Sequence, residues 1–220
     1  MKVVAFVPIK MNNERVPGKN TRSFENGEPL VTRILNTLSK VTNIDETYVY
    51  CSNSEIENFM PSTAKFLKRS EDLDQSTTKI NEVISSFISD VEADIYVLAH
   101  ATAPFITASS IEKGVRAVKS EKYDSSLSVL KLQEFLWKNE KPFNYSLDSI
   151  PRTQDLEPLY EETSGFYVFE KHLAKNENRR IGNKPYLVEV SKIEASDIDN
   201  PIDFDIANAI YNHIILPEEK

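Results

Sequence analysis

The sequence predicts an α/β fold: a Rossmann-like, mostly parallel sheet flanked by helices. Short continuous apolar runs recur as far as Leu132, for example Lys2–Ile9 and Asp94–Ala99. Such runs are typical of strands that are buried on both faces of a sheet. Segments with apolar residues at helical spacing lie between them, for example Thr78–Asp90. This alternation of strand and helix is typical of parallel sheets with helices on both faces.

Turn and capping signals place the individual elements. Ser52 and Glu55 form a capping-box pattern that predicts a short helix, and Asn26–Gly27 predicts a turn. The expected strands are 2–9, 47–51, 64–67, 94–99, 125–132, 165–170 and 186–190, and the expected helices are 29–40, 78–90, 107–119 and 201–215. Ligands of such sheets bind beyond the carboxyl ends of the strands. The polar segments after Ile9, Leu67 and Ala99 are therefore expected to converge on one rim.

Residues 133–162 differ in character from the rest of the chain. They combine aromatic residues with prolines and charges and show no helical pattern. We expect one domain over residues 1–220, in which residues 133–162 form an extended arm or hairpin lobe. Aromatic side chains such as Trp137, Phe135 and Tyr160 either pack within this lobe or form a contact between two copies.

Charge and composition narrow the classes of partner. The 220 residues carry a formal net charge of −8, which disfavours general attraction to nucleic acid or to anionic membranes. No apolar stretch approaches the roughly 20 residues of a membrane span. The opening residues do not resemble a signal peptide because Pro8 interrupts the apolar run, so a cytoplasmic location is expected. The single cysteine, Cys51, allows no internal disulfide and is interpreted as a core residue.

A cluster of cations follows the first expected strand. Lys10, Arg15 and Lys19 fall within ten residues, and Pro17–Gly18 permits a sharp turn between them. Arginine can hold a phosphate through two parallel N–H bonds, whereas lysine acts as a point charge. The segment matches neither the P-loop pattern nor the dinucleotide-binding glycine pattern. From the residues alone, a triphosphate-binding loop and a solvated loop with scattered cations remain equal alternatives.

The stretch from Val7 to Asn20 resembles the N-terminal signature of the CMP-sugar synthetases, the acylneuraminate and 3-deoxy-manno-octulosonate cytidylyltransferases. Arg15, Pro17, Lys19 and Asn20 match that signature, and Lys10 stands where the family has arginine. The resemblance implies that Lys10, Arg15 and Lys19 bind and stabilise the triphosphate and that Asn20 contacts the nucleotide.

Three further segments resemble the family in the same order along the chain. The resemblance of Lys68–Leu73, and of Thr77 after it, implies that Arg69 and Thr77 contact the nucleotide. Leu98–Pro104 implies acceptor contacts from His100 and Thr102, with His100 in place of the family's glutamine. The alternative for His100 is a structural role at the end of a strand. Ile106 replaces an arginine that often follows this motif, which indicates a variant acceptor.

The third segment, Ser196–Asp203, carries a pair of aspartates. Asp197 and Asp199 are alternate residues of an expected extended segment, so both carboxylates face one side. Magnesium prefers one or two carboxylates together with phosphate oxygens, and the resemblance implies a catalytic Mg²⁺ on Asp197 and Asp199. Asp203 is interpreted as the start of the last helix, where the helix dipole favours an acid.

The resemblance also implies acceptor contacts from the arm, at Arg152, Gln154 and Tyr160. The alternative for Arg152 is a salt bridge within the loop. Together these features predict a CTP-dependent nucleotidyltransferase, and a homodimer, that transfers CMP to an acidic sugar with release of pyrophosphate. Two alternatives remain open. One is transfer to a sugar phosphate or another anionic acceptor, although such enzymes favour a glycine-rich first loop. The other is a catalytically degenerate nucleotide-binding protein.

Overall fold

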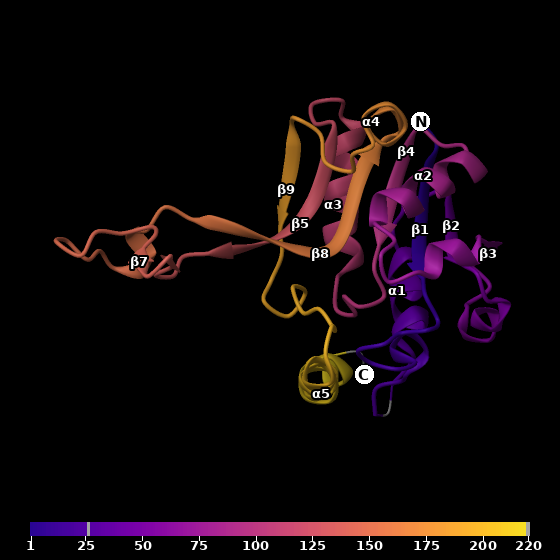
Figure 1. Ribbon diagram of the computed structural model, residues 1–220, viewed down its shortest axis with the longest axis horizontal. Coiled ribbons are helices and arrows are strands. Elements are labelled where there is room, and N and C mark those ends of the chain that lie inside the picture. Colours follow the sequence, from indigo (N-terminus) through magenta and orange to yellow (C-terminus); the bar gives the residue numbers. More distant parts are fainter. Residues whose placement is uncertain (26, 219–220) are drawn as a thin grey trace.

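A seven-stranded sheet with strand order β3-β2-β1-β4-β8-β5-β9 forms the body of the molecule (Figure 1). The computed structural model describes residues 1–25 and 27–218, so Asn26 of the expected turn lies outside the described residues. The strands are β1 (Val3–Ile9), β2 (Glu46–Cys51), β3 (Lys65–Lys68), β4 (Ile95–Ala99), β5 (Ser125–Leu132), β8 (Leu159–Glu170) and β9 (Pro185–Glu189). Every neighbouring pair is parallel except for the two pairs that contain β8, which runs antiparallel to β4 and to β5. The predicted mostly parallel α/β sheet is confirmed.

Helices cover both faces of this sheet. They are α1 (Leu30–Leu38), α2 (Ile80–Asp90), α3 (Ala108–Lys119), α4 (Lys171–Glu177) and α5 (Pro201–Ile210), with a π-helical turn η5 (Tyr211–Ile215) and α6 (Leu216–Glu218) after α5. Short 3-10 turns are η1 (Lys19–Thr21), η2 (Ser54–Phe59), η3 (Glu71–Asp74) and η4 (Thr153–Asp155). The sequence analysis missed α4. The expected capping role of Ser52 belongs instead to Asn53, whose side chain accepts a hydrogen bond from the Glu55 backbone N–H.

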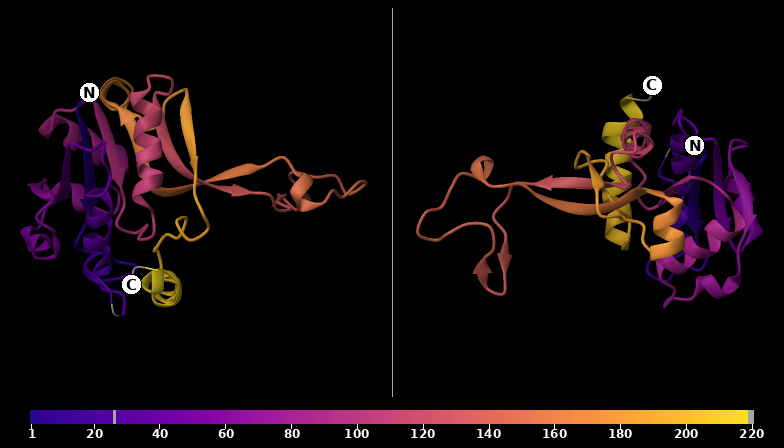
Figure 2. Two further views of the ribbon diagram at one scale, coloured as in Figure 1. Left: turned by 180° about the vertical axis from the view of Figure 1, so that it is seen from behind. Right: turned by 90° about the horizontal axis from the view of Figure 1, so that it is seen from above.

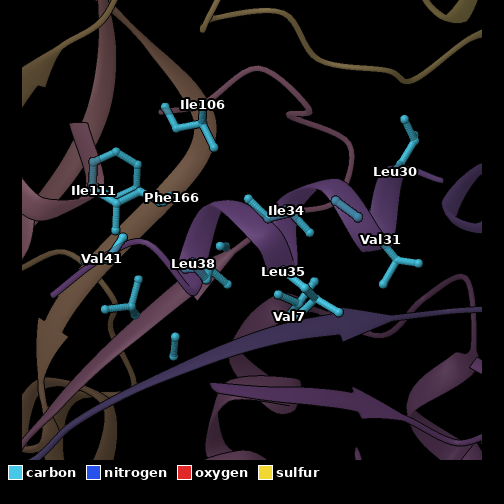
Figure 3. Close-up of a cluster of buried hydrophobic side chains, with 14 of the residues drawn as sticks. Val7, Leu30, Val31, Ile34, Leu35, Leu38, Val41, Ile106, Ile111 and Phe166 are labelled. Atoms are coloured by element: carbon cyan, nitrogen blue, oxygen red, sulfur yellow. The ribbon is translucent and has the colours of Figure 1, made fainter. Parts of the chain in front are cut away.

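Alternating residues of the strands supply two hydrophobic cores. Helices α1, α3 and α5 pack on one face, where Ile34, Ile106 and Phe166 belong to the same cluster of buried side chains (Figure 3). Helices α2 and α4 pack on the other face, where the rings of Phe6 and Phe87 stack with centroids 4.1 Å apart. Because side chains of a strand alternate between faces, a run such as β1 contributes to both cores.

The expected arm is a long projection from the sheet. Strands β5 and β8 continue their pairing as far as Leu132 and Leu159, and the chain between them extends away from the body (Figures 1 and 2). It contains a small hairpin of β6 (Trp137–Lys138) and β7 (Lys141–Pro142). Within residues 1–25 and 27–218, no helix combines the length and the apolar character needed to cross a bilayer.

The carboxyl end of β1 and the N-terminus of α5 lie at the same end of the molecule (Figure 1). The loop that follows β1 and the segment that follows β9 are therefore neighbours, although more than half of the chain separates them in sequence. A backbone hydrogen bond from Ile198 N–H to the Thr102 carbonyl (2.9 Å) also holds the second segment against the loop after β4.

Candidate active site at the carboxyl rim of the sheet

The loop Lys10–Asn20 is closed by its own polar groups. Gly18 adopts φ 65°, a left-handed conformation that glycine accepts without strain. Asn20 is buried, and its side-chain amide donates to the Lys10 carbonyl (3.0 Å) and to the Asn13 side chain (3.4 Å). These bonds join the start of the loop to its end, so the position of Lys10 relative to Lys19 is determined by Asn20.

The predicted cations and the predicted aspartates meet at this loop. Arg15 forms an ion pair with Asp199 (2.8 Å), and Lys19 Nζ lies 3.6 Å from the same carboxylate. Lys19 also donates to the Ile198 carbonyl (2.7 Å), and its side chain is only 12% exposed whereas that of Arg15 is 62% exposed. Exposed ion pairs contribute only about 0–1 kcal/mol to stability. These contacts therefore contribute little to the stability of the fold. Their main effect is to gather charged side chains at one place on the rim.

Asp197 occupies a different environment from Asp199. Its Oδ1 is buried and has no hydrogen-bond partner in the described part of the chain. Burial raises the pKa of Asp197, and the nearby Asp199 raises it further, whereas the Thr102 side chain and Lys19 lower it. A buried carboxylate oxygen without a donor is costly unless a cation or another donor reaches it. Its chemistry therefore fits a divalent cation.

Asp203 has the structural role that the sequence predicted. Its side chain accepts from the backbone N–H groups of Asp199 (3.0 Å) and Asn200 (2.7 Å), and it completes the capping box of α5. These bonds, together with the neighbouring Lys19, keep the pKa of Asp203 below its usual range. In the described residues no three or more His, Cys, Asp or Glu side chains cluster as a metal site. Two carboxylates alone suit magnesium, which takes its other ligands from phosphate and water.

Two cavities adjoin the loop. The smaller, which we call the cation cavity, has a volume of about 230 Å³ and is lined by Lys10, Asn13, Glu14, Arg15, Val16, Lys19 and Ser76. The larger, about 540 Å³, is lined by Met11, Asn12, Ser52, Asn53, Ser54, Lys68, Glu71 and Asp74. Thr77, the predicted nucleotide contact, is exposed and belongs to neither lining. Its neighbour Ser76 lines the cation cavity instead.

Arg69 lies beneath the larger cavity. Its side chain is 3% exposed and forms an ion pair with Asp74 (2.7 Å), which also accepts a hydrogen bond from Ser52. Its Nε is buried and has no hydrogen-bond partner among the described residues. Arg69 therefore orders the wall of the cavity through Asp74. Its predicted contact with a nucleotide stays a prediction.

His100 ends β4 at the same rim. Its ring lies 6.3 Å from that of Tyr167, measured between centroids. Burial of the imidazole lowers the pKa of His100 to about 4, and the charges of Arg180 and Lys19 act in the same direction. At pH 7 the neutral imidazole is therefore the favoured form of His100. Thr102, two residues further along, contacts the aspartate segment, since its carbonyl accepts from the Ile198 N–H (2.9 Å).

Arg180 is a further charged residue of this region, and it was not predicted from the sequence. The guanidinium of Arg180 lies over the Tyr167 ring, 3.9 Å from the centroid, and donates to the Tyr167 hydroxyl (3.1 Å). It also pairs with Glu162 (3.3 Å). Arg179 is likewise partnered, by Glu177 and by the Ile181 carbonyl. Two adjacent arginines carry no sequence signal for these tertiary contacts.

The predicted acceptor contacts of the arm do not lie at the rim of the same chain. The arm projects away from the loop Lys10–Asn20 (Figure 2). Arg152 is 72% exposed and forms a bidentate pair with Asp155 (2.8 and 3.0 Å), as the salt-bridge alternative predicts. Gln154 is exposed, and Tyr160 is 45% exposed on β8. Ile106, by contrast, is buried in the core and presents no group to a ligand.

Comparison with known proteins identifies the family. Residues 4–218 match the sequence pattern of the cytidylyltransferases. The chain belongs to this family. Its relatives include proteins named as acylneuraminate and 3-deoxy-manno-octulosonate cytidylyltransferases. The prediction that the chain belongs to the CMP-sugar synthetases is therefore confirmed.

Two relatives and one solved structure illustrate the similarity. The chain is 25% identical to N-acylneuraminate cytidylyltransferase A of Danio rerio, over 93% of the chain and 50% of that protein. It is 26% identical to CMP-N,N'-diacetyllegionaminic acid synthase of Legionella pneumophila, over 93% of the chain and 94% of that protein. The fold matches that of CMP:2-keto-3-deoxy-manno-octonic acid synthetase complexed with CTP with a TM-score of 0.73 and 14% identity, over all of both chains. The cytidylyltransferase chain spans about half the length of the Danio rerio and Streptococcus agalactiae relatives that it matches.

The environment of His100 predicts a pH dependence of stability. The pKa of histidine in the unfolded chain is about 6.5, and the pKa of His100 in the folded chain is about 4. The unfolded chain therefore binds the proton more tightly, so this contribution to stability is present above pH 6.5 and is lost as the pH falls towards 4. His100→Gln is expected to make the free energy of unfolding fall less steeply across this window, as measured by urea unfolding at several pH values. The exposed His213→Gln is the control, and an unchanged slope in His100→Gln would contradict the assignment.

Proposed function

We propose that this cytidylyltransferase transfers CMP from CTP to a sugar acid and releases pyrophosphate. The observation that supports it most directly is the meeting of Arg15 and Lys19 with Asp199 at the carboxyl rim of the sheet. Such sheets bind ligands at this rim, and a polyphosphate bound with a metal requires cations and carboxylates side by side. A solvated loop with scattered cations would not explain why Lys19 is nearly buried against the aspartate segment.

The triphosphate is proposed to occupy the cation cavity, where Lys10, Arg15 and Lys19 converge. Lys19 is held by the Ile198 carbonyl, so its charge is positioned before the ligand binds. Arg15 is exposed, and in exchange for its ion pair with Asp199 it could form two parallel bonds to phosphate oxygens. The nucleoside is proposed to occupy the adjoining larger cavity, whose wall Arg69 and Asp74 order.

Asp197 and Asp199 are proposed to bind Mg²⁺. The buried Oδ1 of Asp197 without a hydrogen-bond partner in the described chain and the nearby Asp199 carboxylate fit a divalent cation. When bound, Mg²⁺ would neutralise phosphate charge and lower the pKa of an acceptor hydroxyl. Asp199 would hold the metal in place of its ion pairs with Arg15 and Lys19, and these two side chains would then be available to the triphosphate.

The reaction is a single in-line displacement. The acceptor hydroxyl oxygen forms a bond to the α-phosphorus of CTP, the bond from that phosphorus to the bridging oxygen breaks, and the hydroxyl proton passes to solvent. Lys10, Arg15 and Lys19 stabilise the charge that develops on the leaving pyrophosphate, and the rim orients the two substrates. Neutral His100 and Thr102 face the acceptor as hydrogen-bonding groups.

A sugar acid is proposed as the acceptor because the names of the relatives are those of enzymes acting on sialic, legionaminic and 3-deoxy-manno-octulosonic acids. The test is pyrophosphate release with each nucleoside triphosphate, Mg²⁺ and a panel of sugar acids and sugar phosphates. Release with CTP and a sugar acid is the expected result. If pyrophosphate is released only with a sugar phosphate, the acceptor is a sugar phosphate and not a sugar acid. Tight CTP binding without pyrophosphate release across the panel would indicate a degenerate enzyme.

Asp199→Asn tests the carboxylate assignment. The change keeps the size of the side chain and removes the charge that binds metal, so kcat is expected to fall by about two orders of magnitude or more, as for other losses of transition-state stabilisation. Thermal unfolding followed by circular dichroism should shift little, since the ion pairs of Asp199 are exposed. Asp205→Asn, an exposed aspartate of α5, is the matched control and should keep wild-type turnover. Wild-type turnover in Asp199→Asn would remove the metal assignment.

The arm is proposed to pair with a second copy of the chain. Its exposed apolar side chains are Phe135, Trp137, Phe143, Leu147, Ile150 and Tyr160, between 38% and 63% exposed. Exposed apolar patches of this kind mark interaction surfaces. Because the arm extends beyond its own body (Figure 1), Arg152 and Gln154 are proposed to reach the acceptor at the rim of the second copy.

The double variant Trp137→Ser with Phe143→Ser is expected to convert a dimer to a monomer, because it removes two large apolar surfaces from the arm. Light scattering coupled to size-exclusion chromatography measures the mass. Ile206→Ser is the control, since Ile206 is a similarly exposed apolar residue on α5 (54%). A monomeric wild type, or loss of the dimer only in Ile206→Ser, would contradict an arm-mediated contact.

A further inference from the structure

Glu194 lies three residues before Asp197 and joins two segments of the rim. Its Oε1 accepts from the Thr107 N–H (3.2 Å), the Thr107 hydroxyl (2.8 Å) and the Ser110 hydroxyl (2.6 Å) at the start of α3. Its Oε2 accepts from the N–H and the hydroxyl of Ser191 (3.1 and 3.2 Å). One carboxylate therefore accepts five hydrogen bonds, three from the helix start and two from the segment that leads to the aspartates.

These bonds are one of three anchors around the aspartates. The second is the backbone bond from Ile198 to Thr102 (2.9 Å), and the third is the bond from Asp199 N–H to Asp203 (3.0 Å). Asp197 lies between the first and second anchors. Asp199 directly follows the second anchor and carries the third on its own N–H. The backbone is therefore held on both sides of Asp197 and at Asp199 itself.

Capping of α3 alone does not account for Glu194. The helix has its own cap, since the Thr107 hydroxyl accepts from the Ser110 N–H (3.2 Å). The bonds to Ser191 satisfy no group of the helix. What Glu194 adds is a fixed distance between α3 and the aspartate segment, and such supporting contacts determine whether metal ligands are held in a productive geometry.

We propose that Glu194 is a positioning residue that holds Asp197 and Asp199 in place for a divalent cation. The inference rests on the proposed function, because it requires these aspartates to be the metal ligands. Glu194 itself contacts neither substrate nor metal. Its loss is expected to weaken metal binding more than it weakens the fold.

The test compares Glu194→Gln with Glu112→Gln. Glu112 lies on the same helix and also ties it to a loop, through Thr42 (3.1 Å) and Asn43, but that loop carries none of the proposed ligands. Mn²⁺ binding to the full chain with CTP present is measured by electron paramagnetic resonance, and unfolding by urea is measured in parallel. Glu194→Gln is expected to weaken Mn²⁺ binding at least fivefold, and Glu112→Gln less than twofold. Both variants are expected to shift the urea midpoint of unfolding by similar amounts.

Ser191→Ala covers the possibility that Glu194→Gln does not fold. It removes one donor from the aspartate side, leaves the carboxylate in place and should weaken Mn²⁺ binding by an intermediate factor. Equal Mn²⁺ affinity in wild type and Glu194→Gln, or equal weakening in Glu112→Gln, overturns the positioning role alone. If wild type binds no Mn²⁺ with CTP, the metal assignment of the proposed function fails, and this inference fails with it.

Discussion

The arrangement of the rim depends on the contact of Arg15 and Lys19 with Asp199. A chain with a net charge of −8 repels an anionic ligand at long range, so any site for a triphosphate must be a local reversal of charge. The fold produces this reversal by ending β1 and starting α5 at the same end of the sheet (Figure 1). The aspartate that faces the two cations prevents a patch of uncompensated positive charge in the free protein. Under the proposed function, a metal bound to this aspartate would take the place of the two cations and make them available.

Most of the fold follows from local sequence, and the exceptions have a common cause. Runs such as Val3–Ile9 are apolar throughout because both faces of the strand are buried, and this pattern predicts a strand correctly. It does not state the direction of the neighbouring strand. The antiparallel insertion of β8 between β4 and β5 therefore could not be predicted, since it depends on pairings such as Leu98 with Tyr167. The seven-residue helix α4 was missed because so short an element offers less than two turns of periodicity.

The same limit applies to the candidate site. The loop Lys10–Asn20 and the pair Asp197 and Asp199 stand out because each is a compact cluster in the sequence, but only the family resemblance gave them expected roles. The structure brings Asp199 to the loop. Arg180 could not be found, because its contacts with Tyr167 and Glu162 come from segments that are adjacent only in the fold. Glu194 carried no signal for a related reason: a lone glutamate in a polar segment acquires its role from the start of a helix more than eighty residues away.

The position of Ile106 bears on which acceptor this chain selects. An arginine at this point would have to leave the core or be buried with a partner, since the site lies among Ile34, Leu38 and Phe166 (Figure 3). Ile106 therefore supplies no charge to the rim, and under the proposed function an acceptor carboxylate would need a cation from another position. Within the described part of the subunit, Lys19 and Arg180 are the cations whose charges reach His100. Arg180 is already paired with Glu162, so binding of a carboxylate there would have to displace an existing partner. Under the proposed function, Lys19 would be shared with the triphosphate. An arm from a second copy, as proposed, would bring a cation that the triphosphate does not share. Arg152 is itself paired with Asp155, but its side chain is 72% exposed whereas that of Arg180 is 21% exposed, so its ion pair is the weaker one to exchange. Under the proposed dimer, the choice of acceptor would therefore be connected to assembly.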